Sequence, residues 1–258
     1  MSWCKKLARQ LIMANEVILN ASDITVPRRP HEFIEWVERK AKSLGASHEA
    51  KTYARSGAPL SNKFHDEIYP LALFVGHELV GNPDAIVTPN LGNDNFDATI
   101  FLGGCNGTIY IEVTQAKDGY DESRRLEVLT KEGSVSGTGP IVKTQGRRGA
   151  PDRIVEVQSE AVNHDDLLTQ NLLLVETAVR AKANRVYGPR HVLPLAVDDY
   201  VPFREQSDHR ALDALITQKL LSSDLDFSRL VVLGVSGKLY RSYQLPKYAT
   251  RTSIKTTD

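Results

Sequence analysis

Residues 96–116 read FDATIFLGGCNGTIYIEVTQA. Two runs of apolar and β-branched residues, 96–102 and 108–116, flank the glycine-rich segment 103–107. This pattern is typical of two strands joined by a turn. With the turn centred near residues 104–106, the numbers of facing residues add up to about 209 to 212. The sequence therefore predicts an antiparallel hairpin.

Two carboxylates face each other across the predicted hairpin. Asp97 begins the first strand, and Glu112 interrupts the second strand between Ile111 and Val113. Their numbers add up to about 209, so the two side chains lie opposite or diagonally adjacent. A shared hard cation such as Mg²⁺ would remove their repulsion, with the carbonyl of Val113 as a further ligand. The alternative without a metal is an aspartate that caps a turn and a glutamate that faces solvent.

Helical and strand patterns alternate on both sides of the hairpin. Apolar spacing predicts helices over residues 33–44 and 64–79, the second with a kink or a fresh start at Pro70. The remaining expected elements are a strand at 85–88, a mobile basic loop at 117–152, a helix at 154–186, a strand at 191–197, a helix at 208–222 and a hairpin at 230–243. This order predicts an α/β fold with a central mixed sheet flanked by helices.

The chain divides into an N-terminal helical extension, residues 1–60, and an α/β core, residues 61–258. The helical patterns at the start of the chain are marginal for folding alone, so we expect them to pack against the core.

Composition limits the classes of protein to which the chain can belong. Of 258 residues, 41% are hydrophobic and 25% charged, which excludes disorder over the whole length. Lys plus Arg and Asp plus Glu both number 32, so a nucleic-acid partner would be held by a local patch. The longest apolar run, 71–75, is too short to cross a bilayer, and the two cysteines fit a reducing compartment. We expect a cytoplasmic protein with no membrane partner.

The order of elements around Asp97 and Glu112-Val113-Thr114 resembles the PD-(D/E)xK nuclease superfamily, over roughly residues 61–243. The resemblance implies a restriction-endonuclease-like core and hydrolysis of phosphodiester bonds in DNA or RNA with Mg²⁺ or Mn²⁺, DNA being favoured. It also implies that Asp97 and Glu112 are ligands of the metal. Thr114 stands where this family has a lysine.

The missing lysine is the main departure from the family. Thr114 can hold a water through its hydroxyl but cannot supply the positive charge that orients a water and stabilises the transition state. Gln115 and Lys117 are the candidates for a substitute. Gln115 points to the opposite face by strand alternation, and Lys117 lies beyond the end of the strand, from where its long side chain could swing in.

The family usually adds an acidic residue from the helix before the hairpin. Glu78 is the first candidate, because its spacing from Leu71 and Val75 puts it on the apolar face of that helix. Glu67 is the reserve candidate, about three turns earlier. The alternative for Glu78 is a carboxylate in solvent at the end of a helix.

Basic residues suggest where phosphates could bind. Lys143, Arg147 and Arg148 lie in the glycine-rich loop and are candidates for phosphate contacts, the alternative being a solvated loop. Three further cations, Arg180, Lys182 and Arg185, end a predicted helix. The helix dipole favours cations there without any ligand, so the sequence does not mark them as a binding site.

Three hypotheses about function follow. The first is a metal-dependent nuclease. The second is a noncatalytic nucleic-acid-binding protein with a degenerate nuclease fold. The third is an interaction protein in which the paired carboxylates are incidental, and a homodimer is left open in each case.

Overall fold

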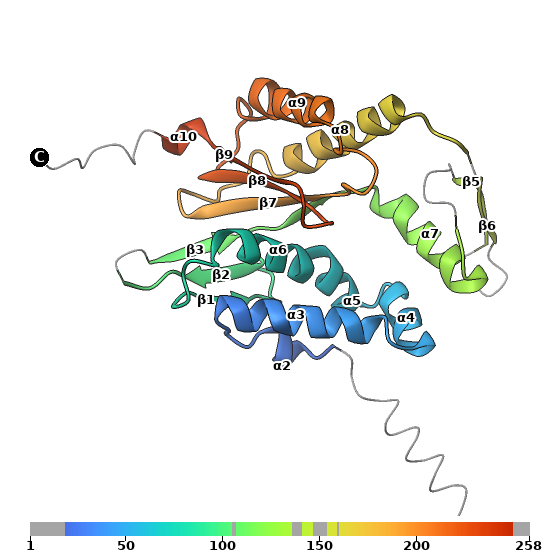
Figure 1. Ribbon diagram of the computed structural model, residues 1–258, viewed down its shortest axis with the longest axis horizontal. Helices are drawn as coiled ribbons and strands as arrows, with labels where there is room; N and C mark the ends of the chain where they lie inside the picture. The colour runs from blue at the N-terminus through green and yellow to red at the C-terminus, as the bar shows by residue number, and fades with distance from the viewer. Residues whose placement is uncertain (1–18, 105–106, 136–140, 147–153, 159, 250–258) are drawn as a thin grey trace, which may run out of the picture.

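The computed structural model describes residues 19–104, 107–135, 141–146, 154–158 and 160–249 (Figure 1). A mixed seven-stranded sheet has the order β1-β2-β3-β7-β8-β9, with β4 also paired to β7. These strands are β1 (Ile86–Pro89), β2 (Ala98–Phe101), β3 (Thr108–Ile111), β4 (Thr114–Ala116), β7 (His191–Val197), β8 (Arg229–Gly234) and β9 (Tyr240–Gln244). Strands β3, β4 and β8 run parallel to β7, and the other pairs are antiparallel. The predicted α/β fold with a mixed sheet is confirmed.

Helices cover both faces of this sheet (Figure 1). Helices α3 and α6 lie on one face, and α8 and α9 lie on the other. The helical segments are α2 (Ala21–Ile24), α3 (Pro30–Leu44), α4 (His48–Arg55), α5 (Pro59–Lys63), η1 (Phe64–Ile68), α6 (Tyr69–Glu78), α7 (Gly119–Glu132), α8 (His164–Arg180), α9 (Gln206–Leu215), η3 (Ile216–Leu220) and α10 (Pro246–Ala249).

Each face of the sheet has its own hydrophobic core. Phe33 of α3, Phe64 of η1 and Ile100 of β2 belong to one core, and all three are fully buried. Val175 of α8 and Leu195 of β7 belong to the other core. As expected, the N-terminal helices pack against the core, because α3 and the sheet share one apolar cluster.

The hairpin has the predicted register. Ala98 pairs with Ile111 and Phe101 pairs with Thr108, so the numbers of paired residues add up to 209. Just beyond this register the pairing shifts by one residue, because the Asp97 N–H donates to Ile111 O, and Glu112 follows Ile111 at the same end of the pair. The hairpin therefore carries both carboxylates at the end of the sheet away from the turn.

A π-helical turn, η1, lies inside the helix that runs from Pro59 to Glu78. The Tyr69 N–H donates to Phe64 O, five residues earlier, instead of to His65 O. Pro70 follows in the first turn of α6, where its missing N–H and its ring disfavour a regular turn before it. Of the predicted kink or fresh start at Pro70, the structure shows a helix that continues through a wider turn, with Pro70 in the first turn of α6.

The sequence prediction was wrong between the hairpin and β7. The expected loop at 117–152 contains α7 and strand β5 (Ile141–Gln145). The residues that mark α7 in the sequence lie at its two ends. At the start, the Asp118 side chain accepts hydrogen bonds from the N–H groups of Tyr120 and Asp121, and at the end Gly133 adopts the left-handed conformation with φ 77°.

The expected helix at 154–186 begins as a strand, β6 (Ile154–Val157), which pairs with β5. The true start of α8 is marked by Asn163, whose side chain accepts from the Asp166 N–H. The proline and aspartate at 151 and 152, which suggested a helix start, lie outside the described residues.

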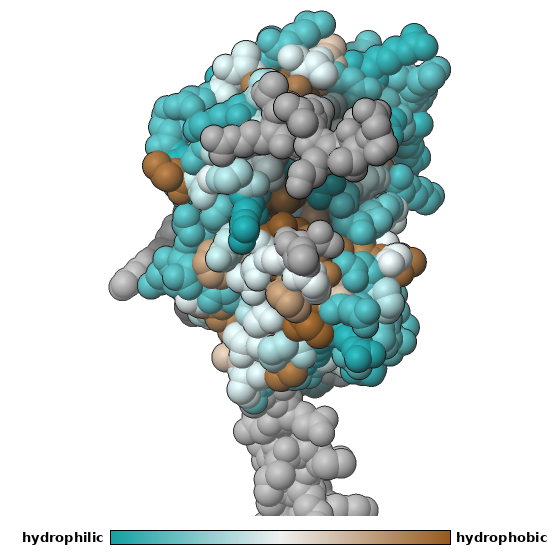
Figure 2. Space-filling view, turned by 90° about the vertical axis from the view of Figure 1, so that its left-hand side faces the viewer, coloured by the Kyte–Doolittle hydropathy of each residue, from teal (hydrophilic) through white to brown (hydrophobic). Residues whose placement is uncertain are grey.

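In the described residues, no helix is long and apolar enough to span a membrane. Figure 2 shows the end of the molecule where β2 and β3 turn, with hydrophobic residues in small groups among hydrophilic ones. The two carboxylates of the hairpin lie at the other end of these strands.

Candidate functional site

Asp97 is fixed at the end of the sheet by its backbone and by its side chain. Its N–H donates to Ile111 O and its carbonyl accepts from Asn90 N–H, both at 2.7 Å. Asp97 Oδ2 accepts a hydrogen bond of 2.8 Å from Val113 N–H. This contact ties the carboxylate to the chain immediately after Glu112 and leaves Oδ1 to face the helix before the hairpin.

Lys63 and Glu67 of that helix meet Asp97. Lys63 Nζ lies 2.5 Å from Glu67 Oε2 and 3.4 Å from Asp97 Oδ1. Burial and the neighbouring Asp97 carboxyl raise the pKa of Glu67 to about 8, although Lys63 opposes this shift. Burial lowers the pKa of Lys63, but Glu67 and Asp97 raise it by more. Glu67 lies on η1, and π-helical turns occur frequently at functional sites.

Glu112 has its own pair of partners. Lys182 Nζ donates to Glu112 Oε1 at 2.6 Å, and Tyr187 OH lies 3.4 Å from the same oxygen. The side chain of Glu112 is 10% exposed and that of Lys182 is 17% exposed. Burial raises the pKa of Glu112, Lys182 opposes the shift, and Asp97 adds to it. A lysine therefore compensates the buried charge of Glu112.

The three carboxylates have the right chemistry for a hard cation, because such ions prefer oxygen ligands. Glu67, Asp97 and Glu112 offer carboxylate oxygens, and burial together with the neighbouring Asp97 raises the pKa of both glutamates. Among the described residues, no three His, Cys, Asp or Glu side chains form a ready group for a metal ion. A cation would have to compete with Lys63 and Lys182 for these oxygens.

The three residues proposed for the lysine's role lie close to Glu112 in the chain but differ in their contacts. Thr114 begins β4, next to Leu195 of β7. Gln115 Nε2 donates to His65 O at 2.8 Å, the carbonyl that the π-helical turn deprives of its usual backbone donor. Lys117 pairs with Asp66 on the same turn. Gln115 and Lys117 therefore hold η1 and do not contact Asp97 or Glu112.

Glu78 lies away from this cluster. Its two carboxylate oxygens accept from Arg229 Nη1 and Nη2 at 3.0 and 2.8 Å, and Tyr240 OH also donates to it. These contacts join the end of α6 to β8 and β9. The reserve candidate, Glu67, is the acidic residue that lies at Asp97, about three turns before Glu78 along the helix.

The candidate phosphate contacts lie beyond what the structure describes. Arg147, Arg148 and the side chain of Lys143 fall outside the described residues. The cations at the end of α8 are described, and two of them differ in their partners. Arg180 pairs with Glu176 on its own helix, whereas Lys182 reaches Glu112.

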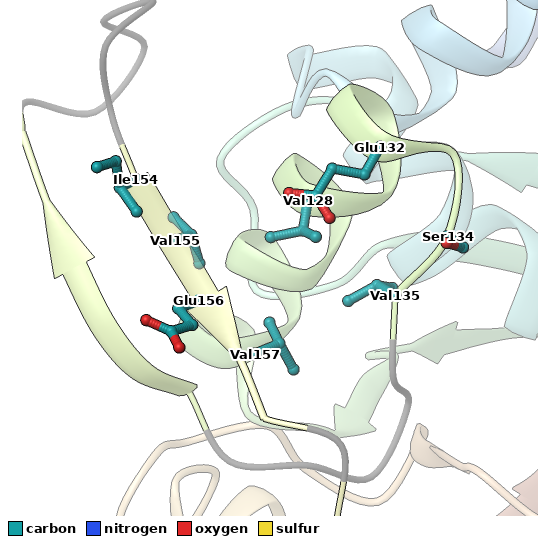
Figure 3. A pocket seen from close by; sticks show the side chains of 8 residues that line it. All are labelled: Val128, Glu132, Ser134, Val135, Ile154, Val155, Glu156 and Val157. Atoms are coloured by element: carbon teal, nitrogen blue, oxygen red, sulfur yellow. The ribbon is translucent and has the colours of Figure 1, made fainter.

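The structure has two cavities of about 530 Å³ each. One borders η1 and β4, and His65, Asp66, Gln115 and Lys117 are among its lining residues. The other lies between α7 and β6 and is lined largely by valines and Ile154 (Figure 3). The first cavity adjoins the turn that carries Glu67, and the second contains none of the candidate site residues.

No family model, no curated protein and no solved structure matches this chain. The site is therefore interpreted from its own geometry.

Sequence reasoning missed Lys63, Lys182 and Tyr187. The signal for Lys63 was its spacing of four residues from Glu67, which permits an ion pair on one helix face. No comparable signal marked Lys182 or Tyr187, because both meet Glu112 through a chain reversal after α8.

Proposed function

We propose that this chain is a metal-dependent nuclease that hydrolyses phosphodiester bonds, with DNA favoured over RNA as substrate. The observation that carries the proposal is the convergence of Glu67, Asp97 and Glu112 at one end of the sheet, with Lys63 and Lys182 among them. The order of elements adds support: a helix, three antiparallel strands, further helices and a strand parallel to the third.

In this proposal Asp97, Glu112 and the Val113 carbonyl hold Mg²⁺ or Mn²⁺, with Glu67 in support. The bound ion would activate a water and neutralise charge on the phosphate. The protein orients Asp97 through the Val113 N–H and Glu112 through Tyr187, so both carboxylates are positioned before substrate arrives. Lys63 keeps Glu67 and Asp97 together by balancing part of their charge.

The test combines metal binding with cleavage. Calorimetric titration of the parent with Mg²⁺ and Mn²⁺ is expected to show stoichiometric heat, and Asp97→Asn is expected to remove it while keeping the size of the side chain. Labelled duplex and single-stranded DNA and RNA should then be cleaved by the parent and not by Asp97→Asn. An active parent whose cleavage persists in EDTA, or in Asp97→Asn, would contradict the proposal.

One observation favours the noncatalytic alternative. Thr114 lacks the charge of the family's lysine, and lysines already neutralise part of the charge of the carboxylates. Under this alternative the chain binds nucleic acid without cleaving it. Binding in a gel-shift assay with no cleavage in Mg²⁺ or Mn²⁺ would favour it over the nuclease.

A further inference from the structure

We propose that Lys182 supplies the positive charge that Thr114 cannot supply, an inference that rests on the proposed nuclease function. Ile111 pairs with Val192 and Thr114 pairs with Leu195, so the register along β7 is unbroken between them. Strand alternation therefore continues through residues 112 to 114, and Glu112 and Thr114 share one face of the sheet. Lys182 reaches that face from the segment after α8 and contacts Glu112.

The backbone around Lys182 is held in place. Lys182 N–H donates to Val179 O at 3.0 Å, which continues the end of α8. Asn184 has φ 61° and donates its N–H to Asp224 O, which ties the chain reversal to the segment before β8. Tyr187 lies in the same segment, and its ring stacks on Phe227 at 4.1 Å. A group fixed in this way loses little freedom when it binds a substrate.

Lys182 has more hydrogen-bonding capacity to spare than Lys63. Lys63 Nζ lies between two carboxylates, Glu67 and Asp97. Within the part of the chain that the structure describes, Glu112 is the one hydrogen-bond partner of Lys182 Nζ. An ammonium has three N–H donors, so two remain for a substrate oxygen. The Lys182 side chain is 17% exposed, so it can be reached from solvent.

The role of Lys182 in the proposed hydrolysis is electrostatic. The oxygen of a water forms a bond to phosphorus, and the bond from phosphorus to the leaving ester oxygen breaks with its electron pair on that oxygen. The water loses one proton and the leaving oxygen gains one, so atoms and charge balance. Lys182 stays protonated and donates an N–H to a nonbridging phosphate oxygen, where negative charge grows in the transition state.

The experiment compares Lys182→Met, Lys182→Arg and the double variant Lys182→Met/Thr114→Lys with the parent. Arg180→Met is the matched control, because Arg180 lies two residues away and pairs with Glu176 on the surface. Single-turnover cleavage is measured with Mg²⁺ on labelled duplex and single-stranded DNA. Mg²⁺ affinity by calorimetry and thermal melting are measured on each variant.

We expect Lys182→Met to lower the cleavage rate by about 10²-fold or more, with Mg²⁺ affinity retained or tighter because a competing cation is gone. Lys182→Arg should keep part of the cleavage rate. The double variant Lys182→Met/Thr114→Lys should cleave faster than Lys182→Met alone, and Arg180→Met should match the parent.

Two results would overturn the role of Lys182 while leaving the proposed nuclease intact. One is cleavage by Lys182→Met within about threefold of the parent. The other is that Lys182→Met loses both cleavage and Mg²⁺ binding and that adding Thr114→Lys restores neither. That result would mean that Lys182 has a structural role. A parent that cleaves no substrate overturns this inference together with the proposed function.

Discussion

At the scale of single residues, charge compensation separates the carboxylates of this chain into two groups. At one end of the sheet, Glu67 and Asp97 share Lys63 and Glu112 pairs with Lys182, and the pKa values of both glutamates are raised. Glu78 is engaged by Arg229 through two parallel hydrogen bonds instead. A bidentate pair of this kind stabilises the fold and leaves the glutamate with little capacity to serve a substrate.

Glu78→Ala is expected to destabilise the protein by about 2 kcal/mol, because Arg229 would be left partly buried without its partner. Urea unfolding measures the change, and Glu35→Ala on the exposed face of α3 serves as the control. Cleavage should be unchanged in Glu78→Ala molecules that remain folded. If cleavage disappeared without loss of stability, Glu78 would belong to the site.

For Glu67→Gln we expect the opposite result, with stability kept and cleavage weakened. Burial and Asp97 disfavour the charged form of Glu67, so the neutral amide should be tolerated with a change in stability of about 1 kcal/mol or less. Divalent binding and cleavage should both weaken, because an amide oxygen is a poorer ligand than a carboxylate. Calorimetry with Mn²⁺ measures the affinity, and an unchanged affinity would exclude Glu67 from the site.

At the scale of elements, the hairpin was predictable and its surroundings were less so. The glycine-rich turn and two apolar runs indicated the register of the hairpin from local pattern alone, and this register places Asp97 and Glu112 at the same end of the hairpin. The π-helical turn that directs Glu67 was indicated only indirectly, by Pro70. Lys182 was beyond prediction from local pattern, because its position depends on a long-range contact at Asn184.

Gln115→Leu tests whether Gln115 positions η1. The substitution removes the donor to His65 O and nearly keeps the volume of the side chain, so stability should fall by about 1 kcal/mol. Cleavage should fall as well, because Glu67 loses its support. Thermal melting and cleavage are compared with Gln244→Leu on exposed β9. A loss of about 10²-fold in cleavage with unchanged stability would mean that Gln115 acts on the substrate.

At the scale of the whole molecule, Asp226 links three parts of the fold. It accepts from Tyr187 N–H at 2.9 Å and Tyr248 OH at 2.5 Å, and it pairs with Lys247 at 2.6 Å. The segment that carries Tyr187 is thereby joined to α10. These hydrogen bonds and the Lys247 charge outweigh the effect of burial and lower the pKa of Asp226 to about 2.

The pH dependence of stability follows from this shift. The pKa of Asp226 is lower in the folded state than the ordinary aspartate value of 3.8, so its contribution to stability is full above about pH 4 and is lost as pH falls through about 2. Asp226→Asn should cost up to about 2 kcal/mol at neutral pH and flatten the acid side of the stability curve. Urea unfolding between pH 2 and pH 7 checks this, and an unchanged acid slope would contradict it.

The central claim is that the carboxylates at the end of the sheet form a metal site. A crystal soaked in Mn²⁺ tests it most directly, because the anomalous signal locates the ion without assuming its ligands. We expect a peak about 2.1 Å from oxygens of both Asp97 and Glu112, with Lys63 moved away from Asp97. No peak at these oxygens, with Lys63 and Lys182 still paired to the carboxylates, would contradict it.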